Sequence, residues 1–490
     1  MRVHVKRLAR LVLIVLAVVL VIGTVRTLRL QSVQPAPGSP ASITLDPNAA
    51  AERLGGAIRF PTVSWGDAST RDSRAFLDLH AYLTDQFPGV GRLLTREAIA
   101  TYSLLYTWPG RRTDLPPIIL VAHLDVVPVE SSGRAWSQPP FSGALANGSV
   151  WGRGAIDDKS GVLGLLEAVE ALITMGFTPE RTVYLAFGHN EEDGGDPSGA
   201  AAIAEHLAGR GVQDAWLLDE GGVIYDRVPG VRQPVAFIGI TEKDPVIFEL
   251  RVVGAGGHAS MPPAETAVGL LGRALDRLEE RPMPSRLDGA ARAMFMTLAP
   301  EMTIPMRAVF ANLWLTRPMV LRRFAMTPET NATIRTTMAA TMLQASRKSN
   351  VLPTSAHAIV NVRLLPGDTN ETVTQHMRSV IDDDRVIITV LAGGDRNPPP
   401  ISPTGTPEFV RLGSAIRSIY PEVLVAPFLT VAATDSRHFA RIAPRMYRFL
   451  PIHFDGAETV HGVDEHVPVD AYANAIRIYA TIIQSIAGGS

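Results

Sequence analysis

Clusters of histidine and acidic residues along the chain could bind metal ions and move protons. In order, they are His123-Leu124-Asp125, Asp157-Asp158, Glu191-Glu192-Asp193, Asp219-Glu220 and the segment from His461 to His466. Each cluster is weak evidence alone, because an Asp at the start of a helix often only caps that helix. The sequence has no cysteine, which excludes thiolate ligands and cysteine nucleophiles, so His, Asp and Glu must hold any metal.

The segments around these clusters indicate how they could meet. Residues 117–127, 181–187 and 215–218 are apolar runs typical of buried strands, and 160–175 has the apolar spacing of a helix. This alternation predicts an α/β fold with a mixed, largely parallel sheet. Because ligands of open α/β sheets gather at the carboxyl ends of strands, we expect the first four clusters to share one sheet edge.

A second domain is predicted in the middle of the chain. Strand patterns at 245–253, 356–364 and 386–391 alternate with helical patterns at 266–280 and 371–382. We therefore expect the following organisation: an N-terminal segment at 1–30, a linker at 31–45, a catalytic domain in two parts at 46–243 and 397–490, and a smaller α+β lid inserted at 244–396.

Methionines are concentrated inside the predicted lid. Eight of the 14 methionines lie between Met294 and Met342, together with several arginines and Trp314. Adaptable core packing is the favoured interpretation. The alternative is an apolar surface that binds an acyl chain, the membrane or a subunit partner.

The N-terminus carries a predicted membrane anchor. Leu11 to Val25 form a run of 15 uncharged, mostly aliphatic residues, with cations on both sides. Flanking arginines can extend so short an apolar span. No small-residue cleavage site follows the run directly, so we favour an anchor over a cleaved signal that would release a secreted protein. The cations before the run place the N-terminus in the cytoplasm and the catalytic domain on the extracytoplasmic side, periplasmic or luminal.

Composition and motif searches exclude other functions. With 46 Lys and Arg against 48 Asp and Glu, the net charge is -2, and a nucleic acid is not an expected partner. No Gly-x-Ser-x-Gly sequence occurs, which counts against a serine hydrolase. A non-catalytic, membrane-tethered binding protein on the same fold, and a broader amidohydrolase, remain as alternatives.

From about residue 50 onward, the sequence resembles the zinc metallopeptidase family of aminoacylases, carnosinase and the membrane-anchored carboxypeptidase S. The matching segments are AHLDVVP (122–128), WGRGAIDDKSG (151–161), AFGHNEEDGG (186–195), LLDEGG (217–222), GAGGHASMP (254–262), SNVLP (349–353), ATDSRHF (433–439) and HGVDEH (461–466). Their joint occurrence is highly specific, whereas each segment alone is not.

The resemblance implies two Zn²⁺ ions per chain. His123, Asp157 and Asp219 would hold one ion, while Asp157, Glu192 and His461 would hold the other. Asp157 would bridge the two ions, and its peptide bond to Asp158 would be cis.

The resemblance also implies a reaction and a substrate class. Glu191 would be the general base that activates a metal-bridged water, and Asp125 would orient His123. His258, Asn350 and Arg363 from the lid would bind substrate. We expect a hydrolase of small N-acyl amino acids or dipeptides with a free C-terminal carboxylate, and a possible homodimer through the lid.

Overall fold

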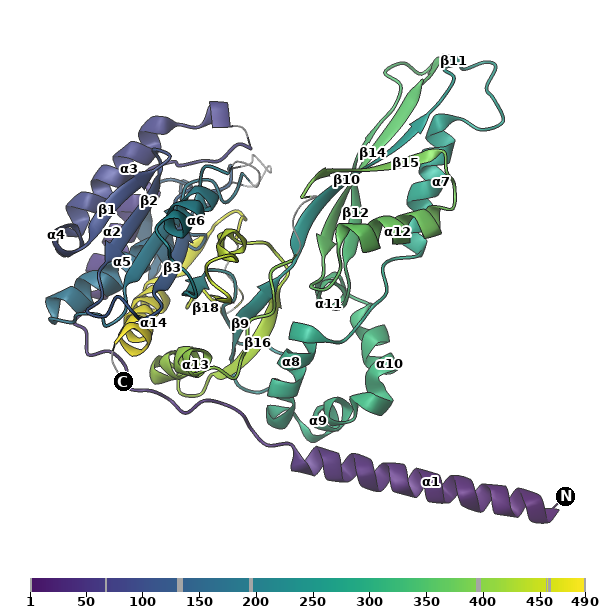
Figure 1. Cartoon of the computed structure of the whole chain (residues 1–490), viewed down its shortest axis with the longest axis horizontal. Coiled ribbons are helices and arrows are strands. Elements are labelled where there is room, and N and C mark those ends of the chain that lie inside the picture. The colour runs from purple at the N-terminus through teal and green to yellow at the C-terminus, as the bar shows by residue number, and fades with distance from the viewer. Residues whose placement is uncertain are drawn as a thin grey trace.

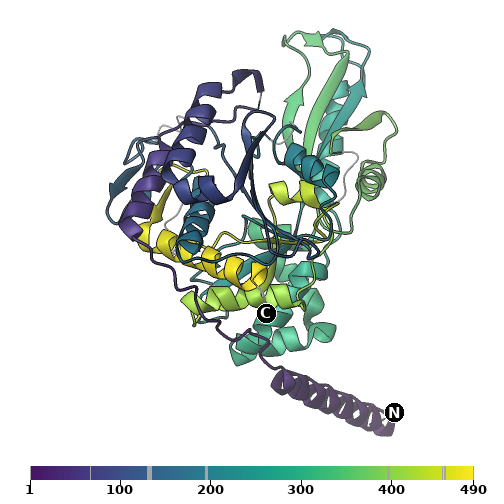
Figure 2. The ribbon, with the colours of Figure 1, turned by 60° about the vertical axis from the view of Figure 1, so that its left-hand side comes forward.

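The computed structural model describes residues 2–66, 68–129, 135–193, 197–393, 398–454, 456 and 460–488. Figure 1 shows an α/β body, a lid that rises away from it, and a group of short helices beside one long N-terminal helix. In the rotated view of Figure 2, the long helix again projects from the body.

A 10-stranded mixed sheet forms the centre of the body. Its order is β1 (Thr95–Ile99), β2 (Ser103–Trp108), β6 (Val183–Gly188), β3 (Ile118–His123), β7 (Trp216–Asp219), β17 (Arg445–Arg448), β9 (Val235–Glu242), β8 (Ile224–Tyr225) and β18 (His453–Phe454), with β16 (Leu424–Thr430) also paired to β9. The central strands β6, β3, β7 and β17 run parallel, and β1 and β2 extend the sheet antiparallel. The predicted mixed, largely parallel α/β fold is confirmed.

Helices bury both faces of this sheet. One face is covered by α2 (Pro47–Ile58), α3 (Ser73–Gln86), α4 (Pro88–Leu93), α5 (Lys159–Thr174), α13 (Pro407–Ile419) and α14 (Val469–Ala487), and the other by α6 (Ala200–Gly209) and the 3-10 helix η3 (Asp435–Phe439). Ile118 and Leu120 of β3 pack in the first core, whereas Ile119 and Val121 pack in the second. This alternation explains why β3 is apolar throughout.

A three-stranded sheet links two segments that are far apart in sequence. It comprises β4 (Ala144–Ala146), β5 (Ser149–Trp151) and β19 (His466–Pro468). Trp151 and His466 are paired in register, and their rings stack with centroids 4.2 Å apart. The pairing brings the chain before His466 alongside the loop that follows Trp151.

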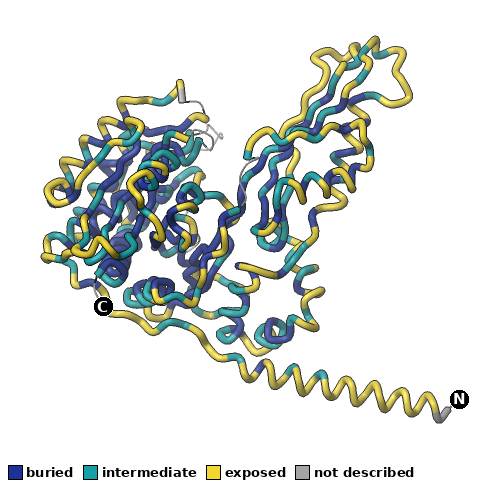
Figure 3. Tube along the Cα trace, in the orientation of Figure 1, coloured by how far each residue is buried: buried dark blue, intermediate teal, exposed yellow. Residues whose placement is uncertain are grey.

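The lid has its own sheet and core. Its antiparallel order is β12 (Thr337–Gln344), β14 (Ser355–Leu364), β10 (Asp244–Val253) and β15 (Val386–Ala392), packed against α7 (Ala267–Glu280) and α12 (Asn370–Ile381). Buried residues alternate along β10 and β14, as the sequence pattern predicts for a sheet covered on one face. A short ribbon of β11 (Gly257–His258) and β13 (Val351–Leu352) forms the exposed tip (Figure 3).

Helices that the sequence analysis did not predict occupy the middle of the insertion. They are α8 (Gly289–Leu298), η2 (Ala299–Glu301), α9 (Ile304–Ala311), α10 (Leu313–Phe324) and α11 (Pro328–Ile334). Phe295 and Phe310 share a core with Phe237 and Leu424 of the body sheet, so this part of the insertion packs on the body. Met302 is buried there, as core packing requires, while Met319 and Met326 are exposed.

The N-terminal helix α1 (Arg2–Arg29) is the one described helix that is long and apolar enough to cross a membrane. It extends the apolar run of 11–25 at both ends. The predicted linker follows as extended chain fixed to the body: the Gln34 side chain bonds the Val425 backbone N–H and C=O at 2.7 and 3.1 Å, and Gly38 N donates to Ser414 O. A further 3-10 turn, η1 (Ala68–Thr70), lies between α2 and α3.

Candidate active site

Two histidines that are far apart in the sequence converge on the carboxylate of Asp157. His123, the last residue of β3, has its Nε2 2.8 Å from Asp157 Oδ1, and His461 has its Nε2 2.8 Å from Asp157 Oδ2. The same His461 nitrogen lies 3.0 Å from Glu192 Oε1. Each oxygen of Asp157 thus has its own imidazole, which is the arrangement that a carboxylate shared between two ions requires.

The loop that carries Asp157 is held by a buried carboxylate. Glu465 Oε1 accepts hydrogen bonds from the backbone N–H groups of Gly154, Ile156 and Asp157 at 3.1, 2.8 and 3.2 Å. Its Oε2 accepts one from Arg153 at 2.6 Å. Glu465 precedes β19, so the pairing of β19 with β5 delivers it to this loop. The Asp157–Asp158 peptide bond is cis, as the resemblance implied.

Asp125 positions both the first histidine and the acidic turn. Its carboxylate is buried, lies 3.3 Å from His123 Nδ1, and accepts hydrogen bonds from the Glu191 and Glu192 backbone N–H groups at 3.1 Å each. Ser64 Oγ donates to it at 2.6 Å. Burial alone would raise the pKa of Asp125, but its contacts with His123 and Ser64 hold that pKa below the usual value.

The adjacent acids Asp219 and Glu220 have different surroundings. Asp219, the last residue of β7, accepts hydrogen bonds from the backbone N–H groups of Glu220 and Ser436 at 2.9 and 2.6 Å. The Glu220 carboxylate instead lies within 4.8 Å of ligand atoms of His123 and Asp158 and lines the cavity. Side chains alternate along a strand, so neighbouring acids point to opposite sides. The assignment of Asp219 as a ligand stays a prediction, and the position of Glu220 makes it a second candidate for the same role.

A cavity of about 470 Å³ opens over this cluster. Its floor carries Asp157, Glu191, Glu192 and Glu220, together with His461. Its other walls include Arg363 and Ile247 from the lid strands and Arg437 from η3. Carboxylates and guanidinium groups therefore face one space from two parts of the molecule.

Two predicted lid residues lie elsewhere. His258 and Asn350 are exposed at the tip ribbon, where Ala259 N donates to Asn350 O at 3.1 Å, and neither His258 nor Asn350 lines the cavity. In Figure 1 the tip at β11 lies at the far end of the lid. A single chain does not bring these two residues to Glu191.

The acids of the site lie close together and are partly buried. Burial raises the pKa of Glu191 well above its usual value, and the neighbouring charges of Asp435, Glu192 and Asp157 add to this. Burial and the Asp157 charge do the same to Glu220. The contacts of His461 with Asp157 and Glu192 raise its pKa to about 10. Such a cluster is stabilised by cations, and imidazole nitrogens with carboxylate oxygens are a donor set that suits zinc.

An α/β sheet that gathers this His and carboxylate set at its strand ends defines a metal-dependent hydrolase. The sequence profile of peptidase family M20/M25/M40 matches residues 119–485, and the chain belongs to this family. The resemblance noted from the sequence is thereby confirmed, as is the prediction of a hydrolytic enzyme.

Similar proteins cover almost the whole chain. A mouse (Mus musculus) protein named N-fatty-acyl-amino acid synthase/hydrolase PM20D1 is 40% identical over 443 residues, covering 89% of this chain and 87% of its own. A Dictyostelium discoideum protein named probable carboxypeptidase S-like 2 is 38% identical over 449 residues, covering 90% and 86%. The crystal structure of an M20 family metallo-carboxypeptidase from Sulfolobus solfataricus shares the fold, with a TM-score of 0.64, 16% identity, and 89% and 98% covered.

The first prediction concerns the loop that holds Asp157. Glu465→Ala should lower the free energy of unfolding by about 3–5 kcal/mol, because it leaves the buried Arg153 guanidinium without its partner. Denaturant unfolding of the metal-free chain in detergent measures this. Asp114→Ala, at the exposed Arg112–Asp114 pair, is the control and should leave the transition unchanged. An equally small effect of both variants would contradict the role given to Glu465.

The second prediction distinguishes the two adjacent acids. Glu220→Gln should reduce the zinc bound per purified chain, because it removes a negative oxygen donor beside His123. Asp219→Asn should leave the zinc content near wild type, because Asp219 accepts backbone hydrogen bonds. Elemental analysis after dialysis measures both variants. Loss of zinc in Asp219→Asn alone would restore Asp219 as the ligand.

Proposed function

We propose that this chain hydrolyses the amide bond of small N-acyl amino acids or dipeptides that carry a free C-terminal carboxylate. The observation that carries the proposal is the Asp157 carboxylate, each of whose oxygens faces a different histidine while Glu191 faces the same cavity. The named functions of the mouse and Dictyostelium relatives support this substrate class.

The metal centre in this proposal contains two Zn²⁺ ions. His123, Asp157 and Glu220 would hold one ion, and Asp157, Glu192 and His461 the other. Three carboxylates would offset three of the four positive charges, which suits a partly buried site. Zinc bound here would polarise the scissile carbonyl and make a water a strong nucleophile near neutral pH.

The protein groups perform the proton transfers. Glu191 accepts a proton from the attacking water and returns it to the leaving amine. Asp125 fixes the His123 ring and, through two backbone N–H groups, the turn that carries Glu191. Arg363 and Arg437 offer planar guanidinium groups to the substrate carboxylate.

Two further parts of the proposal concern the setting of the enzyme. Helix α1 anchors the chain in a membrane with the catalytic body on the extracytoplasmic side, the alternative being a secreted enzyme after cleavage of this segment. A homodimer through the lid brings His258 and Asn350 of one copy toward the cavity of the other. In support, β12 is an exposed edge strand with Met342 and Leu343 more than half exposed.

The third prediction tests the base. Glu191→Gln keeps the size of the side chain and removes the proton acceptor, so kcat should fall by about 10²-fold or more while zinc content stays at the wild-type level. Glu192→Gln should instead reduce zinc content. Kinetics on N-acyl amino acids together with elemental analysis measure both effects. Wild-type turnover in Glu191→Gln would mean that another residue is the base. A full zinc content in Glu192→Gln would mean that Glu192 is not a ligand.

The fourth prediction tests recognition of the substrate carboxylate. Arg363→Lys keeps the charge and loses the planar fork, so kcat/KM should fall by about 10- to 100-fold, the equivalent of a charge-assisted hydrogen bond. Amidated substrates should react poorly with wild type and show no further loss in the variant. Arg273→Lys, on the exposed face of α7, is the control. Equal rates on free and amidated substrates would favour a less discriminating amidohydrolase.

A further inference from the structure

Helix α1 is joined to the body by hydrogen bonds to the short helices. Asn312 Nδ2 donates to Gly23 O at 3.1 Å, and Arg26 donates to Ala311 O at 3.2 Å. The Arg307 guanidinium donates to Thr27 O at 2.9 Å and also bonds Leu30 O. With the following segment fixed along the body, these contacts set the direction in which α1 leaves it.

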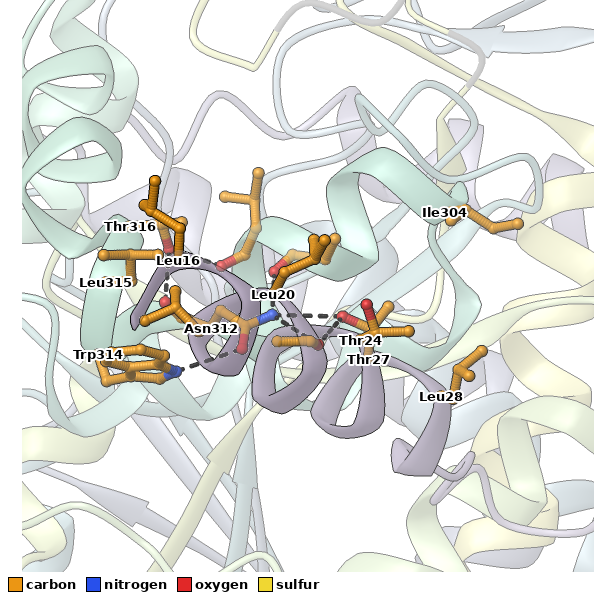
Figure 4. Close-up of a pocket in the computed structure, with 14 residues that line it drawn as sticks. Leu16, Leu20, Thr24, Thr27, Leu28, Ile304, Asn312, Trp314, Leu315 and Thr316 are labelled. Carbon is orange, nitrogen blue, oxygen red and sulfur yellow. Dashed lines mark hydrogen bonds between the residues drawn. The ribbon is translucent and has the colours of Figure 1, made fainter. Parts of the chain in front are cut away.

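An apolar cavity of about 550 Å³ lies between α1 and the segment 304–316. Leu16 and Leu20 line it from α1, and Ile304, Trp314 and Leu315 line it from the short helices (Figure 4). The order of contacts is regular: Thr27 meets Arg307, Gly23 meets Asn312, and the next turns of α1 face the residues after Asn312.

The side chains that continue this cavity outward are apolar and exposed. Ile304, Trp314, Leu315 and Met319 are 77%, 52%, 55% and 56% exposed, and together they form what we call the α9–α10 surface. Isolated exposed apolar residues are common, but Ile304, Trp314 and Leu315 line one cavity beside an apolar helix, and Met319 follows Leu315 by about one turn of α10, so the set indicates a binding surface.

Positions along α1 give the depth at which this surface lies in a bilayer. A helix rises about 1.5 Å per residue, so Leu20 and Leu16 lie about 9 and 15 Å along the axis from Arg26. A bilayer core is about 30 Å thick. If α1 crosses the membrane with Arg26 near its boundary, Leu16 and Leu20 lie inside the hydrocarbon. Trp314 and Leu315, which line the cavity beside Leu16 (Figure 4), then enter the same leaflet.

The charged residues around the α9–α10 surface are of the kind that contacts anionic lipid headgroups. Between Met302 and Pro328 the sequence has no acidic residue and four arginines, at 307, 317, 322 and 323. Arg317, Arg322 and Arg323 are exposed on α10. Helices that lie in a lipid interface combine Trp and aliphatic side chains with cations that contact anionic headgroups.

We propose that the α9–α10 surface is seated in the bilayer beside α1 and that lipid acyl chains occupy the cavity between them. This inference rests on the proposed anchoring of α1 and adds that the body itself enters the membrane at a fixed orientation. The occupant is lipid because the surface is continuous with the membrane-crossing helix and carries the matching cations.

The absence of cysteine permits a direct test in the full-length chain. Leu315→Cys, Met319→Cys, Leu20→Cys in α1 and Leu77→Cys on α3 would each carry one environment-sensitive fluorophore, in vesicles of phosphatidylcholine and phosphatidylglycerol. Leu77 is 48% exposed on the body and is the matched control. Spin-labelled lipids should quench the probes at 315 and 319 severalfold more than the probe at 77, and to an extent comparable with position 20.

Each other result overturns the inference in a distinguishable way. Quenching at 20 with no more quenching at 315 and 319 than at 77 would leave the anchor intact and remove the α9–α10 surface from the bilayer. Blue-shifted but unquenched probes at 315 and 319 would mean that protein covers the surface. No quenching at position 20 would contradict the anchor and, with it, the inference. Hydrolytic activity of each labelled variant verifies that it is folded.

Discussion

The site depends on one carboxylate that must serve two partners at once. Asp157 can do so because its loop is fixed from behind by Glu465, which accepts three backbone hydrogen bonds and pairs with the buried Arg153. His123 and His461 come from strands and loops more than 300 residues apart in sequence and meet only at Asp157. The remaining acids crowd around this contact, and their raised pKa values reflect the cost of burying them without a counter-charge.

Much of this arrangement could be predicted from sequence. The apolar run before His123 and the glycine-rich loop before Asp157 indicated strand ends and a turn, and the joint motifs identified the family. The different surroundings of Asp219 and Glu220 could not be predicted, because the sequence does not give the residue at which the strand ends. The four residues of β7 are all buried, so no alternation along this strand distinguishes the two acids.

Tertiary packing decided the other differences. The helices between Gly289 and Ile334 have no clean apolar period, because their buried side chains face the body sheet as well as one another. His258 and Asn350 were placed by motif alone, and motif does not reveal that their ribbon lies at the tip of an extended lid. The linker was predicted from composition, and composition does not reveal that the Gln34 side chain bonds the Val425 backbone.

The lid and the body are joined in a way that keeps Arg363 opposite the acids. The buried Lys243, between β9 and β10, donates to Ala332 O, Arg335 O and Thr337 Oγ1 at 3.1, 3.0 and 3.0 Å, and so ties the base of the lid to α11.

The most direct test of the proposed metal site is an anomalous diffraction map at the zinc edge from crystals grown with zinc. We predict two peaks, one near Asp157 Oδ1, His123 and Glu220 and one near Asp157 Oδ2, His461 and Glu192, each at about 2.0–2.2 Å from its ligands. A single peak, or two peaks that do not share Asp157, would contradict it.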